Sequence, residues 1–164
     1  MNLRAVFRTL ITLGKGVVTG LADAAADRDP IELFNEWFGV ARASGILLPE
    51  STALATATSD GKPSVRMVLL KGFDAHGFVF YTNYSSRKAD ALEQNPSAAL
   101  LFHWAVLQRQ ICIEGTVGRV TVEESTEYFH SRPRGSQIGA WASRQSEPLE
   151  NRSVLEERFR QEEA

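Results

Sequence analysis

The dipeptide Asp60-Gly61, which lies between two β-rich runs, is the short feature that most constrains the fold of this chain. Asp-Gly is well suited to a tight turn between antiparallel strands. A second turn over residues 74–77 leads into residues 78–82, so these runs together predict a meander of three antiparallel strands. Residues 98–103 and 109–120 are typical of two longer strands.

Helix signals surround these strands. Asp29 can cap a helix whose first turn holds Pro30, and Gly45 can end it. Four residues with helical spacing would form the apolar face of this helix: Ile31, Phe34, Phe38 and Ala41. Further helices are expected within residues 85–96, 121–129, 136–142 and 149–163. Consecutive strands with tight turns and peripheral helices predict a closed antiparallel barrel with helices packed on it.

The composition is that of a soluble globular protein. Of the 164 residues, 43% are hydrophobic and 23% are charged, and the formal net charge is -2. No global field would therefore attract the chain to nucleic acid or to a membrane. Cys112 is the single cysteine, which excludes an internal disulfide and a multi-cysteine metal site. The histidines are scattered and no glycine-rich phosphate loop or nucleophile elbow occurs, so we expect no metal site.

The N-terminal residues form a separate segment. Arg4 and Arg8 precede an apolar run and small residues, as in an export signal, but Lys15 and three glycines interrupt the run. The run is also too short and interrupted to span a membrane. We interpret residues 1–28 as an amphipathic arm, residues 29–146 as one domain and residues 147–164 as a charged helix, in a cytoplasmic protein.

Residues 128–146, YFHSRPRGSQIGAWASRQS, concentrate arginine and hydroxyl side chains. Guanidinium and O–H groups together can saturate the oxygens of a bound phosphate. A solvated loop could have the same composition, so the pattern alone leaves both interpretations open. The sequence SSRK at residues 85–88 allows either an anion site at a helix N-terminus or a capped, solvated helix start. Lys71, which ends the apolar run MVLLK, could equally extend into solvent.

Three segments, taken in order, resemble the pyridoxamine/pyridoxine 5'-phosphate oxidase family. They are RMVLLKGFDAHGFVFYTNYSSRKADALEQNP, LFHWAVLQRQICIEG and EYFHSRPRGSQIGAWASRQS, and the resemblance extends from about Asp29 to Ser146. It implies a mainly β protein with peripheral helices, an antiparallel Greek-key split β-barrel that binds FMN at the interface of a homodimer. The implied reaction oxidises pyridoxamine or pyridoxine 5'-phosphate to pyridoxal 5'-phosphate, in vitamin B6 salvage or biosynthesis. Dioxygen is the implied acceptor and hydrogen peroxide the second product.

The resemblance also implies which residues hold the two phosphorylated ligands. The implied FMN-binding residues are Arg66, Met67, Val68, Leu69, Leu70, Lys71, Tyr81, Thr82, Arg87, Lys88, Gln110, Gln145 and Ser146. Of these, Gln145 and Ser146 are expected to reach the flavin from the other subunit. The residues implied to hold the vitamin phosphate are Lys71, Tyr128, Arg132 and Ser136. Two groups of cationic residues suit two phosphorylated ligands, FMN and the B6 vitamin. The flavin would carry out the redox chemistry.

Members of the family continue for some tens of residues beyond the position of Ala164. That segment supplies two further barrel strands, a tryptophan near the flavin, and an Arg-Leu-His type motif whose arginine and histidine orient the substrate. We therefore expect this chain to be C-terminally truncated, and we assign no catalytic residue within it. Two functions stay open: an oxidase, and a truncated non-catalytic protein that binds FMN or pyridoxal phosphate. A split-barrel flavin reductase with another substrate is a third hypothesis, which the residues implied to hold the vitamin phosphate disfavour.

Overall fold

The computed structural model describes residues 28–163, so the expected N-terminal arm, apart from Arg28, lies outside the described residues. The described chain forms two compact units. The first contains residues 28–55, 65–80 and 99–114, and the second contains residues 56–64, 81–98 and 115–163. Each unit is therefore assembled from segments that are distant in the sequence.

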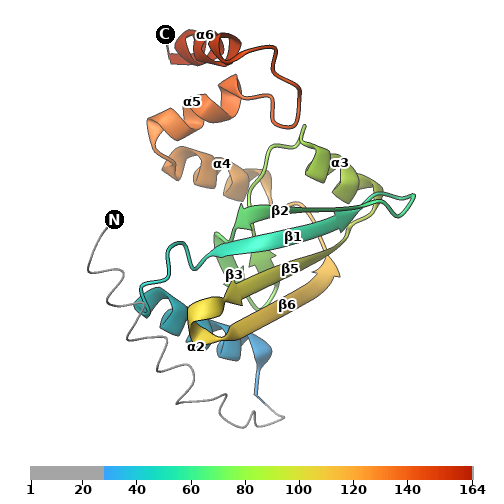
Figure 1. Cartoon of the computed structure of the whole chain (residues 1–164), viewed down its shortest axis with the longest axis vertical. Coiled ribbons are helices and arrows are strands. Elements are labelled where there is room, and N and C mark those ends of the chain that lie inside the picture. Colours follow the sequence, from blue (N-terminus) through green and yellow to red (C-terminus); the bar gives the residue numbers. More distant parts are fainter. Residues whose placement is uncertain (1–27, 164) are drawn as a thin grey trace. The chain divides into compact units, whose positions relative to one another are not determined.

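A four-stranded sheet has most of its residues in the first unit. Its strands are β1 (Ser51–Ala57), β2 (Pro63–Leu69), β5 (Ser97–Trp104) and β6 (Arg109–Thr116), in the order β2-β1-β5-β6 (Figure 1). Because β5 pairs with β1, the chain returns to the sheet beside its first strand. A short 3-10 helix, η1 (Ala105–Leu107), joins β5 to β6. The strands expected from the sequence are confirmed here, although the last one ends at Thr116 instead of residue 120.

The expected meander of three strands is wrong in its pairing. β3 (Gly72–Asp74) and β4 (Gly77–Val79) form a separate two-stranded sheet, in which Phe73 lies opposite Phe78. The chain changes partners just before β3, because the amide of Leu70 donates to the Glu50 carbonyl and the amide of Lys71 donates to the Val79 carbonyl, at 2.9 and 2.8 Å. Continuous β-forming sequence across this point therefore does not continue the larger sheet.

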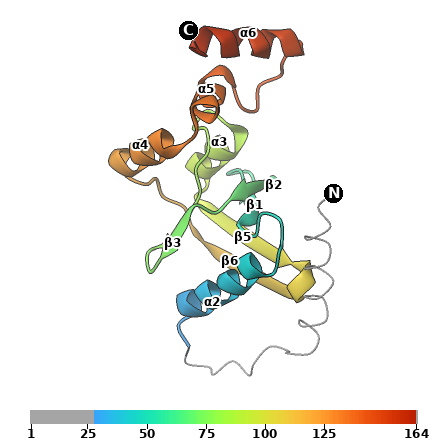
Figure 2. The same ribbon diagram turned by 90° about the vertical axis from the view of Figure 1, so that its left-hand side faces the viewer.

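An aromatic cluster forms the core of the first unit, with Phe34 of helix α2 (Pro30–Ala43) at its centre. The Phe34 ring centroid lies 4.8–6.2 Å from those of the five other rings: Phe38, Phe73, Phe78, Phe102 and Trp104. Figures 1 and 2 both show α2 beside the part of the sheet formed by β5 and β6. The Asp29 carboxylate caps α2, as expected, by accepting from the Ile31 and Glu32 amides at 2.7 and 3.1 Å.

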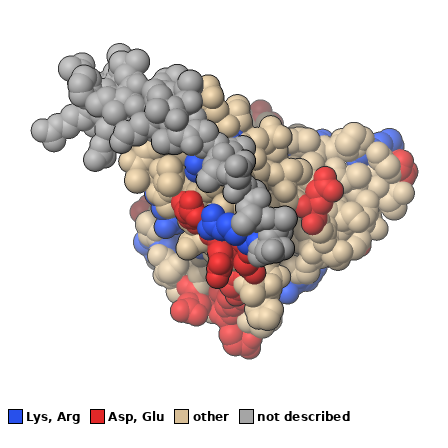
Figure 3. Space-filling model, turned by 90° about the horizontal axis from the view of Figure 1, so that it is seen from below, with Lys and Arg blue, Asp and Glu red and all other residues tan. Residues whose placement is uncertain are grey.

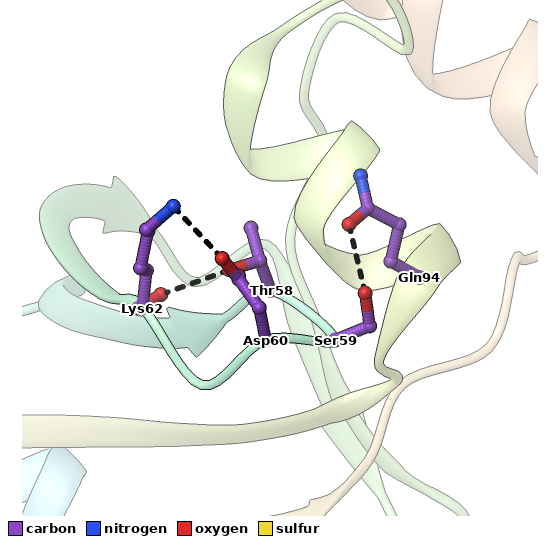
Figure 4. Close-up of polar contacts among 5 residues, drawn as sticks. All are labelled: Thr58, Ser59, Asp60, Lys62 and Gln94. Carbon is purple, nitrogen blue, oxygen red and sulfur yellow. Dashed lines mark hydrogen bonds and ion pairs between the residues drawn. The ribbon is translucent and has the colours of Figure 1, made fainter.

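The β1–β2 connection confirms the hairpin but changes its turn type. The Gly61 amide donates to the Thr58 carbonyl at 2.9 Å, and the Thr58 amide donates to the Lys62 carbonyl at 3.1 Å. These bonds close a three-residue loop in which Gly61 has a φ of 81°, the left-handed conformation that favours glycine. Figure 4 shows Lys62 paired with Asp60 at 2.8 Å, and the Ser59 hydroxyl 3.4 Å from Gln94 Oε1.

Helices dominate the second unit. They are α3 (Arg87–Gln94), α4 (Val122–Ser131), α5 (Arg134–Ala142) and α6 (Arg152–Glu163). The Thr121 hydroxyl accepts from the Glu124 amide at 3.1 Å, so the expected N-terminal cap of α4 is confirmed. The Phe159 ring of α6 approaches to 4.0 Å of the position that a Cβ on Gly139 of α5 would take, which shows that these two helices are in contact.

The helix lengths and the surface charge bear on which partners the described residues could meet. No helix in residues 28–163 is long and apolar enough to cross a membrane. Figure 3 shows that, on the face it presents, acidic and basic side chains both occur and wide areas carry neither. Because the formal net charge is -2, binding of an anion would depend on a local arrangement of donors.

Candidate anion-binding site

The side chain of Lys88, in the first turn of α3, is buried, with 9% of the residue exposed. Its Nζ donates to Gln145 Oε1 at 2.7 Å, Thr82 Oγ1 at 2.9 Å and Ser86 Oγ at 3.2 Å. Burial of an ammonium group is costly unless it is hydrogen-bonded. Each of these three acceptors is a neutral oxygen atom, and together they orient the ammonium group.

The neighbouring Arg87 is also held by neutral groups. Its Nη2 donates to Ser64 Oγ at 2.9 Å, and its backbone amide donates to Ser146 Oγ at 3.2 Å. Ser146 has a φ of 76°, which is unusual for a residue other than glycine. Ser86, the N-cap residue of α3, makes no side-chain cap bond, and its hydroxyl accepts from Lys88 instead. The start of α3 therefore combines a helix N-terminus with two oriented cations.

A tyrosine pair lies elsewhere in the same unit. The rings of Tyr81 and Tyr128 stack with centroids 3.7 Å apart and planes 4° from parallel. The Tyr81 hydroxyl lies 3.4 Å from Glu124 Oε1, to which it donates. Burial raises the pKa of Tyr81 above its ordinary value, and the nearby Glu124 carboxylate raises it further. Tyr81 is thus held as a neutral hydrogen-bond donor against the ring of Tyr128.

Arg132 and Ser136 flank the junction between α4 and α5. Arg132 is the first residue after α4, and Ser136 lies in the first turn of α5. The Gln137 Nε2 group donates to the Arg132 carbonyl at 2.8 Å, which fixes this corner. Pro133, the N-cap residue of α5, supplies no side-chain cap, whereas its carbonyl accepts from the Ser136 amide at 2.8 Å and from the Gln137 amide at 3.1 Å.

The remaining expected site residues belong to the first unit. In β2 the exposed residues Val65, Met67 and Leu69 alternate with the partly buried Arg66 and Val68. The Arg66 Nη1 group donates to the Leu54 carbonyl of β1 at 3.1 Å. A hollow of about 470 Å³ is lined by Arg42, Pro49, Glu50, Leu70 and Lys71. Gln110 is exposed on β6.

The structure thus brings together Thr82, Lys88 and Gln145, and separately Arg87 and Ser146. A single chain supplies these contacts, so the expectation that Gln145 and Ser146 must come from the other subunit is not needed to explain them. Ser64 and Glu124 were not predicted from the sequence. Each contacts a residue 23 or 43 positions away, and no local motif indicates such a pairing.

No group of three or more metal-binding side chains occurs within the part of the chain that the structure describes. The groups gathered at the start of α3 include an ammonium and a guanidinium group, which are donors only and suit an anion. The chemistry of this donor set therefore fits a phosphate group.

Comparison with known proteins agrees with this chemistry. Residues 43–164 match the family model described as pyridoxamine 5'-phosphate oxidase. A pyridoxine/pyridoxamine 5'-phosphate oxidase from Colwellia psychrerythraea is 54% identical over 159 residues, which are 97% of this chain and 73% of the relative. One from Rubrobacter xylanophilus is 59% identical over 140 residues, which are 85% of this chain and 64% of the relative.

Solved structures support the same fold. PhzG from Burkholderia lata, crystallised with tetrahydrophenazine-1-carboxylic acid, gives a TM-score of 0.81 at 29% identity, over 87% of this chain and 74% of PhzG. A pyridoxamine 5'-phosphate oxidase-related, FMN binding protein from Nostoc punctiforme gives a TM-score of 0.62 at 16% identity, over 79% of this chain and 72% of that protein, and supports the fold alone. These likenesses confirm the expected antiparallel split-barrel fold.

The match spans between 60% and 74% of the curated relatives' own length. It nevertheless includes most of this chain and every residue of the anion-binding arrangement at the start of α3. The chain belongs to the pyridoxamine 5'-phosphate oxidase family.

Proposed function

We propose that this chain binds FMN and that the start of α3 holds the FMN phosphate. The observation that carries the proposal is the buried Lys88 ammonium group, which three neutral oxygen atoms orient beside Arg87. Together with the Arg87 guanidinium group and the N-terminus of α3, this ammonium group forms a local set of positive donors that suits a phosphate. Bound FMN would supply the two-electron redox chemistry that protein side chains lack.

The FMN-binding residues that the resemblance implies on and just after β2, together with Gln110, are proposed to contact the rest of the flavin. The stretch Arg66–Lys71 consists of the last four residues of β2 and the two that follow, and Tyr81 and Gln145 complete the proposed set. In the second unit, Gln145 is hydrogen-bonded to both Thr82 and Lys88. These bonds support a phosphate-binding site that is already organised before FMN binds.

We further propose that the substrate is pyridoxamine or pyridoxine 5'-phosphate, which is oxidised to pyridoxal 5'-phosphate with dioxygen as acceptor and hydrogen peroxide as product. The curated relatives carry the name of this activity. The junction between α4 and α5 offers the Arg132 cation and the Ser136 hydroxyl for the substrate phosphate. Tyr128, which stacks on Tyr81, and Lys71 are proposed to contribute to the same phosphate.

Two measurements test this proposal. The purified chain should take up FMN and show a flavin absorbance spectrum, and addition of pyridoxamine 5'-phosphate should then generate hydrogen peroxide in a coupled assay. A protein that binds no flavin would contradict the proposal at its first step. Flavin binding without turnover would support the alternative, a non-catalytic protein that binds FMN or pyridoxal phosphate.

The likeness to PhzG gives one specific reason to test a second substrate class. The molecule in the PhzG complex, tetrahydrophenazine-1-carboxylic acid, is a ring carboxylic acid that carries no phosphate. If the α5 site recognises phosphate, pyridoxamine 5'-phosphate should compete with inorganic phosphate, whereas an aromatic ring acid should not be turned over. Turnover of the ring acid alone would favour a PhzG-like activity.

The assembly and location are also proposals. We propose a cytoplasmic homodimer with FMN at its interface, in which residues 29–146 form the flavin domain, flanked by an N-terminal arm and a C-terminal helix. The exposed Val65 and Met67 side chains on β2, an outer strand of the sheet, support a contact with a second copy.

A further inference from the structure

We propose that Ser64 is a positioning residue, which orients the Arg87 guanidinium group and thereby sets the preference of this protein for a phosphorylated flavin. This inference rests on the proposed placement of the FMN phosphate at the start of α3. Ser64 lies near the beginning of β2, and Arg87 opens α3, so the contact between them joins two segments of the second unit.

The geometry of the contact supports an orienting role. Arg87 Nη2 donates to Ser64 Oγ at 2.9 Å, while the Arg87 backbone amide is fixed by Ser146 Oγ at 3.2 Å. Both ends of the arginine are therefore restrained. One nitrogen of the guanidinium group is occupied, and the other two remain for the bidentate contact that a phosphate favours.

The neutrality of Ser64 is as important as its position. None of the ion pairs among the described residues involves Arg87. A carboxylate in the place of Ser64 would orient the arginine and also cancel its charge. A hydroxyl orients it without doing so, and the restraint reduces the side-chain entropy that ligand binding would otherwise remove.

The consequence is a selectivity that can be measured. FMN and riboflavin have the same ring system and differ in the phosphate, so a residue that orients a phosphate ligand should affect FMN alone. Removal of the Ser64 hydroxyl should weaken FMN binding by about 3- to 10-fold, the effect of one net hydrogen bond. Riboflavin binding should not change.

The test compares Ser64→Thr with Ser64→Val in the full chain. Both side chains are β-branched, suit a strand and have nearly the same shape, so they differ in the hydroxyl alone. Ser59→Ala is the matched control, because it removes a hydroxyl from the same hairpin that contacts Gln94 and not Arg87. Dissociation constants for FMN and riboflavin are measured by quenching of flavin fluorescence, and thermal melts confirm that each variant folds.

We expect Ser64→Thr and Ser59→Ala to keep the wild-type ratio of FMN to riboflavin affinity, and Ser64→Val to reduce it. In an Arg87→Ala background, Ser64→Val should have no further effect on FMN binding, because there is no guanidinium group left to orient. If Ser64→Val keeps the wild-type ratio, or still weakens FMN binding without Arg87, the positioning role is wrong. If the wild-type chain binds FMN no better than riboflavin, the proposed phosphate site itself is wrong.

Discussion

Lys88 is a charged residue in a position where charge is costly, and its neighbours explain how the cost is limited. Three oxygen atoms receive its N–H groups at 2.7–3.2 Å, and the residue is 9% exposed. Sequence alone could not distinguish this arrangement from a solvated lysine at a helix start, because burial depends on Gln145, which lies 57 positions away. The resemblance to the family supplied the assignment of Lys88 to an FMN phosphate, which stays a proposal.

Replacement of Lys88 by Met tests this position. The change keeps much of the side-chain volume but removes the positive charge beside the proposed phosphate, so FMN binding should weaken by about 1–4 kcal/mol, the attraction between unit charges about 4 Å apart near a protein surface. The measurement is a fluorescence titration with FMN. Lys62→Met is the control, because Lys62 is an exposed cation in the same unit that pairs with Asp60. Equal affinities in Lys88→Met and the wild type would exclude Lys88 from the phosphate site.

Tyr81 allows a test by pH. Burial and the Glu124 carboxylate raise the pKa of Tyr81, so the folded protein favours the neutral phenol. The stabilisation that results is fully present below the ordinary tyrosine pKa of about 10 and is lost as the pH rises through the higher, folded-state value. Glu124→Gln should lower the pKa of Tyr81 part of the way, because burial remains. The pKa of Tyr81 is measured by ultraviolet titration of phenolate absorbance, with Tyr81→Phe to assign the signal. An unchanged pKa in Glu124→Gln would show that the Glu124 carboxylate does not raise the pKa of Tyr81.

At the scale of secondary-structure elements, the β1–β2 hairpin shows how local sequence determines a turn. Gly61 has a φ of 81° and open space where a Cβ would lie. Gly61→Ala should therefore destabilise the protein through backbone strain alone, by about 1–2 kcal/mol. Gly118→Ala, at a glycine with equal space and no positive φ, should change stability by no more than about 0.5 kcal/mol. Chemical denaturation measures both, and equal effects would contradict the strain argument.

The sequence predicted elements better than it predicted their pairing. Local signals, the Asp29 and Thr121 caps and the Asp60-Gly61 turn, gave the starts of α2 and α4 and the first hairpin. The separation of β3 and β4 from the main sheet was missed, because it depends on backbone bonds from Leu70 and Lys71 to distant carbonyls. For the same reason, the residues of the anion site were named by resemblance, whereas their mutual contacts became known from the structure.

At the scale of the whole molecule, β2 combines two properties that seldom occur together on a monomer. It is an outer strand of its sheet, and its exposed residues Val65 and Met67 are apolar and 65% and 62% exposed. Exposed apolar outer strands invite association with another chain, which natural proteins either exploit or prevent with charges. Arg66 and Val68, which the resemblance implies for FMN binding, lie on the same strand. A contact between β2 and a second copy of the chain would therefore also affect the proposed flavin site.

We therefore expect this chain to form a homodimer that depends on β2 and carries one FMN for each subunit. Met67→Lys places a charge in the apolar contact, and should convert the dimer to monomer and weaken FMN binding together, because the proposed flavin site lies at the interface. Val122→Lys is the control, since Val122 is 76% exposed at the start of α4, outside the proposed contact. Light scattering with flavin absorbance gives mass and FMN content in one experiment. A wild-type monomer with one FMN per chain, or a Met67→Lys dimer with full flavin content, would contradict an interface at β2.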